Sequence, residues 1–189
     1  KIILTFVALF VLFISYLLLP TFYKQGDLSE KLNSELLSKF NLNLKFAKKI
    51  KYNFFPKPHF ITTESVIFEN QMEMSKIGKL KIFVSSRNFF SLKNIEVKDL
   101  IFENANFNLN QKNYSFLIDL LNKNFKESDL IIRNSNIFFR NLEDEVLFIN
   151  KILKMKYYYE PKELKNIFYS DNEIFNIPFS IKSFFNSDK

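Results

Sequence analysis

The sequence predicts a mainly β protein that one N-terminal helix holds in a membrane. Three observations indicate this class. An uninterrupted apolar run opens the chain, an amphipathic helical stretch follows it, and most of the remaining chain consists of short runs typical of strands. We therefore divide the 189 residues into a transmembrane anchor at residues 1–20 and a second region at residues 21–189.

The apolar run at residues 2–19 contains no charged side chain. A helix of about 18 to 20 residues is long enough to span the hydrocarbon core of a bilayer. Pro20 ends this helix because it lacks an N–H and clashes with the preceding turn. The residues assigned to the membrane anchor are Ile2, Phe6, Phe10, Phe13 and Leu17.

A cleaved signal peptide is the alternative interpretation of this run. Its apolar core is shorter, about 7 to 15 residues, and a small-x-small cleavage site follows it. The sequence after the run, LLPTF at residues 18–22, offers no such site. We favour an uncleaved anchor, with the N-terminus at Lys1 in the cytoplasm and the body of the chain outside it.

Residues 27–40 are predicted to form an amphipathic helix. Asp27 supplies an N-cap acceptor, with Glu30 three positions later, and Asn41 is a suitable C-terminal stop. Leucine and phenylalanine at helical spacing form one apolar stripe, made by Leu28, Leu32, Leu36 and Phe40, with Leu37 beside it. We expect this stripe to pack against a sheet; a helix lying on the bilayer is the alternative.

From residue 42 onward the pattern indicates strands. They are predicted at residues 42–46, 50–55, 59–68, 79–85, 95–109, 129–140, 146–149, 153–159 and 173–184. Two helical segments interrupt them, a short helix at residues 114–124 and a turn at residues 161–168 that begins with Pro161.

One strand segment is repeated about 30 residues further along the chain. Residues 100–109 read LIFENANFNL and residues 130–139 read LIIRNSNIFF, while residues 66–70, VIFEN, repeat the start of the motif. Such units favour a sheet that grows by stacking similar pieces. The asparagines are expected at kinks or bulges, where left-handed backbone geometry is tolerated.

Few residues suit catalysis. Cysteine is absent, which excludes disulfides and thiolate sites, and the only histidine is His59. With glycine only at Gly26 and Gly78 there is no phosphate-binding loop. The carboxylates at residues 143–145 are adjacent and fit a solvated turn. We expect no enzyme activity, no metal and no cofactor.

The formal net charge is +7. Basic chains bind nucleic acid, bind anionic lipid, or reflect lysine-rich codon usage. The anchor argues against nucleic acid as a partner and leaves the other two explanations open.

The order of these features carries a resemblance. The anchor at residues 2–19 and the helix at 27–40 are followed by a short strand at 42–46, LNLKF. A proline-bearing stretch at 50–58, IKYNFFPKP, comes next. Next come VIFEN at 66–70, IGKLKIFV at 77–84 and FSLKNIEVKDLIFENANFNL at 90–109. Across about residues 1–124 this order resembles the N-terminal region of the AsmA family (AsmA/TamB-like bacterial envelope proteins).

The resemblance implies an elongated, curled antiparallel β-sheet with an apolar groove. Family members are usually much longer, so this chain would be a fragment of a longer repeat or a short relative. The implied location is the bacterial inner membrane, single-pass, with the bulk of the chain in the periplasm. The implied role is cell-envelope and outer-membrane biogenesis, by binding or conducting lipid.

The expected partners are membrane phospholipids and envelope proteins. The candidate groove-lining residues are Leu80, Ile82, Val84, Ile95 and Val97. The same side chains suit a closed core equally well. An anchored scaffold that binds protein partners in outer-membrane protein assembly or secretion is therefore the alternative function.

Overall fold

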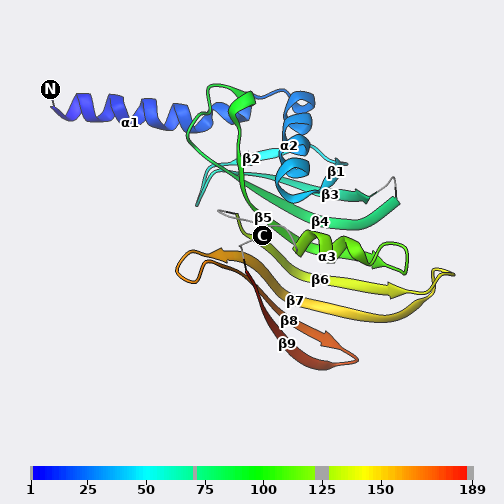
Figure 1. Ribbon diagram of the computed structural model, residues 1–189. Coiled ribbons are helices and arrows are strands. Elements are labelled where there is room, and N and C mark those ends of the chain that lie inside the picture. The colour runs from blue at the N-terminus through cyan, green and yellow to red at the C-terminus, as the bar shows by residue number, and fades with distance from the viewer. Residues whose placement is uncertain (1, 70–71, 122–127, 187–189) are drawn as a thin grey trace.

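The computed structural model describes residues 2–69, 72–121 and 128–186. Its strands form one open, curled sheet with the order β1-β3-β4-β5-β6-β7-β8-β9, and β2 pairs with β3 (Figure 1). All strand pairs are antiparallel except β5 with β6. The predicted fold class, mainly β with an N-terminal apolar helix and short further helices, is confirmed.

The helix α1 (Ile2–Leu18) extends away from the sheet, and none of its side chains is buried (Figure 1). Together with the 3-10 turn η1 (Leu19–Phe22) it is long and apolar enough to span a membrane, as a single-pass anchor requires. Pro20 opens the 3-10 turn and ends the α-helix, as predicted. Four anchor residues are exposed, whereas Leu17 packs partly against the body. Lys1 lies outside the described residues.

The helix α2 spans Gln25–Phe40 and therefore begins two residues before the predicted start. Its N-cap is Lys24 and no side chain caps it, so the predicted cap at Asp27 is wrong; Asp27 lies in the first turn instead. The C-terminal stop is confirmed, because Asn41 adopts left-handed geometry. The predicted apolar stripe of leucines and Phe40 is buried against the sheet, while Leu37 is 50 % exposed.

The first strands are β1 (Asn43–Phe46), β2 (Lys51–Asn53), β3 (His59–Glu69) and β4 (Met72–Val84). After the 3-10 turn η2 (Leu92–Asn94) come β5 (Val97–Leu109), helix α3 (Ser115–Leu121) and β6 (Leu130–Arg140). The predicted helix at 114–124 corresponds to α3, and residues 122–124 lie outside the described residues.

The C-terminal part corrects three predictions. The segments 146–149 and 153–159 form one strand, β7 (Val146–Glu160), with an irregular register between Ile152 and Lys154. The predicted helical turn at 161–168 is wrong, because residues 161–164 form the turn after β7 and β8 (Lys165–Ile174) takes the other half. The predicted strand at 173–184 is a hairpin into β9 (Ile177–Asn186), since Phe175 and Asn176 both have positive φ, as a two-residue turn requires.

The internal repeat becomes a pair of neighbouring strands. Leu100 in β5 lies opposite Leu130 in β6, and the offset of 30 residues holds through Leu109 opposite Phe139. The chain crosses between these parallel strands through α3. Asn104 and Asn134 both have left-handed backbone geometry, which confirms the kinks predicted for the motif. Asn70, at the end of its third copy, lies outside the described residues.

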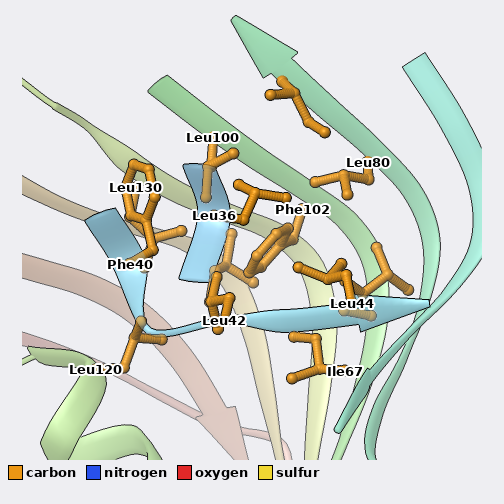
Figure 2. Packing of buried hydrophobic residues seen from close by; sticks show 14 of the residues in the cluster. Leu36, Phe40, Leu42, Leu44, Ile67, Leu80, Leu100, Phe102, Leu120 and Leu130 are labelled. Atoms are coloured by element: carbon orange, nitrogen blue, oxygen red, sulfur yellow. The ribbon is translucent and has the colours of Figure 1, made fainter. Parts of the chain in front are cut away.

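The helices α2 and α3 cover one face of the sheet. Leu36 and Phe40 from α2 and Leu120 from α3 meet side chains of β4, β5 and β6 in one apolar cluster (Figure 2). Leu42, next to β1, and Leu44, within it, join the same cluster. The N-terminal half of the sheet is therefore a filled core, and only its C-terminal strands extend beyond the helices.

Candidate functional site

The face that α2 and α3 cover, together with its continuation over β7, β8 and β9, is called the inner face below. Strand register shows which side chains share it, because paired residues point to the same side of a sheet. One row of paired side chains crosses six strands from β3 to β8. It consists of Phe60, Ile82, Leu100, Leu130, Tyr157 and Phe168.

A second row lies beside the first and reaches β9. It consists of Thr62, Leu80, Phe102, Ile132, Met155, Ser170 and Ile181. Its members are buried from β3 to β8, whereas Ile181 on β9 is 41 % exposed. The inner face is therefore a continuous, largely apolar track that is closed at the helical end and open at β9.

The five candidate groove-lining residues all belong to the closed end. Leu80 and Ile82 lie in the two rows, and Val84 pairs with Val97 at the ends of β4 and β5. Ile95 follows η2 and is buried with them. All five are members of the same core cluster as the α2 stripe. At these positions the chain's own helix occupies the place that a ligand would need.

Polar contacts fix α2 over this end of the track. The Lys39 ammonium donates to the carbonyl of Val97 at 2.7 Å and pairs with Glu96 at 3.2 Å. At the other end of the helix the Gln25 amide bonds both the N–H and the carbonyl of Ile50, at 2.9 and 3.0 Å. Since both ends of α2 are bonded to the body, we treat it as a fixed cover.

The accessible part of the inner face lies on β9 and at Phe148 near the start of β7, because the other inward side chains of β7 and β8 are mostly buried. Its large side chains alternate along each strand with outward-facing polar ones such as Lys154, Lys156 and Lys182. The inward set includes Phe148, Met155, Phe179, Ile181 and Phe185. The sequence pattern alone does not indicate these residues, because small polar side chains on the intervening strand β8 interrupt the apolar alternation.

The polar side chains on the inner face of β8 are buried between larger neighbours. Ser170 lies between Met155 and Ile181, and its hydroxyl donates to the Asn172 amide oxygen at 2.9 Å. Asn172 lies between Ile152 and Phe179, and its amide nitrogen has no partner in the described part of the chain. Because these polar side chains of β8 are buried, the accessible part of the inner face consists mainly of the larger side chains on β9.

A line of left-handed residues crosses the sheet and bends it. Glu64 in β3, Asn104 in β5 and Asn134 in β6 have positive φ, and the register irregularity of β7 lies next in line. Even-numbered residues of β3 and β5 point inward before the kink, and odd-numbered residues point inward after it. Ser65 and Ala105 therefore point inward in place of Glu64 and Asn104. These kinks give the sheet its curl and make the inner face concave.

At the anchor end, two tyrosines join the helix to the loop at residues 85–93. The Tyr16 hydroxyl donates to the Ser86 carbonyl at 2.8 Å and accepts from the Phe89 N–H at 3.0 Å. The Tyr23 hydroxyl donates to the Phe89 carbonyl at 2.6 Å. Burial, with the neighbouring Tyr16, raises the pKa of the Tyr23 phenol.

The side chains considered for catalysis are His59 and the carboxylates at residues 143–145. His59 is buried, its Nδ1 lies 2.7 Å from the Lys57 carbonyl, and its ring stacks on Phe83 at 5.0 Å. Among residues 2–69, 72–121 and 128–186 no group of three His, Cys, Asp or Glu side chains is placed to hold a metal ion. Residues 143–145 lie in the exposed turn between β6 and β7.

The candidate site is the accessible apolar part of the inner face, on β9 and at Phe148. No family model matches this chain, and a search of the curated proteins finds no relative of significant similarity.

Proposed function

We propose that this chain is an inner-membrane-anchored periplasmic protein of the AsmA type. In this proposal it takes part in envelope and outer-membrane biogenesis by binding or conducting phospholipid along the inner face of its sheet. The observation that carries the proposal is the pair of cross-strand rows, which leads from the filled core under α2 to exposed apolar side chains on β9.

The chemistry of this track suits an acyl chain. Burying a methylene group gains about 0.8 kcal/mol, so covering six of them gains roughly 5 kcal/mol. The side chains that would supply the contact on β9 include Phe179, Ile181 and Phe185.

The location of the track also supports the proposal. Strands β3, β5 and β6 begin on the side of the sheet where α1 joins it (Figure 1). A lipid that leaves the bilayer beside the anchor would reach the sheet at these ends.

A photoreactive phospholipid in intact cells tests the proposal. After illumination, we expect label on peptides that contain the inner face of β7–β9. The Ile181→Lys variant should lose most of that label, because a buried ammonium is costly in an apolar track. Ser180→Lys is the matched control, since it places the same charge one residue away on the outward face. Label that is confined to α1, or equal in both variants, would contradict lipid binding by this face.

A second candidate function has an observation of its own. Within the described residues β9 pairs only with β8, so its other edge offers free backbone groups to a partner strand. This favours an anchored scaffold for envelope proteins. In the same labelling experiment, such a scaffold predicts protein crosslinks from β9 and no lipid label there.

A further inference from the structure

An open cavity of about 820 Å³ lies where the anchor meets the body. One wall is η1 and the first half of α2, and the other is the segment at residues 90–93 that leads into η2. The side chains that matter for its chemistry are Phe22, Lys24, Asp27, Glu30, Phe90 and Lys93. The cavity is separate from the inner face, because none of its lining residues belongs to β3–β9.

The two walls of the cavity are held together at the end of the membrane span. Tyr16 and Tyr23 bond the backbone of the 86–89 segment from the helical side. The ring of Tyr16 also lies 5.0 Å from that of Phe90. Because Pro20 ends the apolar helix, residues that follow it directly lie at the level of the lipid headgroups. The cavity is therefore preformed at that level.

Two aromatic side chains that line the cavity are exposed to solvent. Phe22 is 82 % exposed and Phe90 is 80 % exposed. Apolar aromatic side chains at the boundary of a membrane gain free energy by entering the interface. Their position, one on each wall, indicates that both walls contact the bilayer.

Charged side chains of both signs line the cavity, and most of them form no ion pair with the described residues. Lys31 pairs with Glu35 at 2.8 Å. Lys24, Lys93, Asp27 and Glu30 form no ion pair with any described residue. Asp27 and Glu30 are three positions apart and so lie on the same side of α2. Two free cations next to two free carboxylates match a ligand that carries one charge of each sign.

Phosphatidylethanolamine has this charge pattern, and its cation is a primary ammonium with N–H donors. Its phosphate is an acceptor for ammonium groups, and its own primary ammonium donates hydrogen bonds to carboxylates. The trimethylammonium of phosphatidylcholine has no N–H to donate, and an anionic lipid would face the two carboxylates without compensation. We propose that this cavity binds the headgroup of phosphatidylethanolamine, with its phosphate on Lys24 and Lys93, its ammonium on Asp27 and Glu30, and with Phe22 and Phe90 in the interface.

The absence of tryptophan from the sequence gives a clean probe. The full chain carrying Phe90→Trp is placed in bilayer discs of phosphatidylethanolamine, phosphatidylcholine and phosphatidylglycerol, in which one lipid at a time has brominated acyl chains. We expect brominated phosphatidylethanolamine to quench the fluorescence more strongly than phosphatidylcholine at equal content. The expected preference reaches about tenfold in local occupancy, the contribution of one charge-assisted hydrogen bond.

Two further proteins complete the experiment. Adding Asp27→Asn and Glu30→Gln to the probe variant should abolish the preference while quenching persists, and both positions are exposed, so the fold is kept. Phe175→Trp is the control, because Phe175 is 76 % exposed in the β8–β9 turn, at the opposite end of the strands, and should not be quenched. Equal quenching by the two zwitterionic lipids, strongest quenching by phosphatidylglycerol, or no quenching at position 90 would each overturn the proposal. None of these results depends on lipid binding by the inner face.

Discussion

At the scale of single residues, the curl of the sheet depends on a few backbone positions. The kinks at Glu64, Asn104 and Asn134 lie on three different strands, and the strand between the first two, β4, must pass close to them. Gly78 is the residue of β4 that does so. A Cβ atom at Gly78 would lie 3.0 Å from both the Cβ and the carbonyl oxygen of Asn104.

Gly78→Ala should therefore destabilise the protein. Because one of the atoms in the way belongs to the backbone of β5, the strands must separate slightly, and overpacking of this kind costs about 1–3 kcal/mol. Gly26→Ala is the control, since a Cβ there meets nothing within 4 Å and alanine favours the helix α2. Urea unfolding followed by circular dichroism compares the two. Equal stability of both variants would contradict the close approach at the kink.

A second residue-scale prediction concerns Glu103, which lies between two lysines of the neighbouring strand. Its carboxylate is 2.7 Å from Lys81 and 3.3 Å from Lys79. Burial raises the pKa of Glu103, but the hydrogen bonds and charges of the two lysines outweigh this effect and lower the pKa overall. A lowered pKa in the folded state stabilises the protein above the unfolded-state pKa, and this stabilisation is lost as the pH falls through the folded-state pKa.

Glu103→Gln should remove this part of the pH dependence. At neutral pH the variant is expected to be less stable by up to about 1 kcal/mol. The difference should shrink between about pH 5 and pH 3, where the wild-type carboxylate becomes protonated. Unfolding curves at several pH values measure it. Glu143→Gln, in the exposed β6–β7 turn, is the matched control and should leave the pH profile unchanged.

At the scale of elements, α2 decides which part of the inner face is closed. Its buried stripe fills the concave side opposite β4, β5 and β6 (Figure 2). Leu36 is fully buried in this stripe, whereas the next residue, Leu37, is half exposed. A substitution at Leu36 therefore measures the packing of α2 against the sheet, and a substitution at Leu37 measures the intrinsic stability of the helix.

Leu36→Ala should cost about 2–5 kcal/mol, because it leaves a cavity in the core between α2 and the sheet. Leu37→Ala makes the same chemical change on the same helix and should alter the free energy of unfolding by less than about 1 kcal/mol. Denaturant midpoints of the full chain in detergent give both values. Similar losses in the two variants would mean that α2 is not packed as a cover.

These elements also show what the sequence can predict. The leucine stripe and Asn41 define α2 because they follow helical spacing and capping chemistry, and the 30-residue repeat locates β5 and β6 with their kinks. Their parallel pairing could not be predicted, since it depends on the crossover through α3. β8 was missed because Pro161 suits a helix start and the polar residues Ser170 and Asn172 interrupt the alternation. The Phe175–Asn176 turn lacks the glycine that usually marks a hairpin.

At the scale of the whole molecule, the chain consists of an apolar N-terminal helix, a helix that covers part of the sheet, and an apolar surface that is open at β9. Which apolar residues are covered is a tertiary property: Leu80 and Ile181 lie in one cross-strand row, yet the first is buried and the second is open. The sequence pattern treats the two alike. The candidate groove residues therefore lie on the inner face at its closed end, and the open end follows only from the register of β7–β9.

Lipid binding by the inner face predicts that lipid contacts alternate along β9. A photoreactive amino acid is introduced one position at a time at Phe179, Ile181 and Ser183 on the inner face, and at Ser180, Lys182 and Phe184 on the outer face. Mass spectrometry then identifies what each position captures in cells. The account predicts phospholipid adducts at the three inner positions and none at the three outer ones. Protein adducts at both sets, or lipid adducts without this period of two, would contradict it.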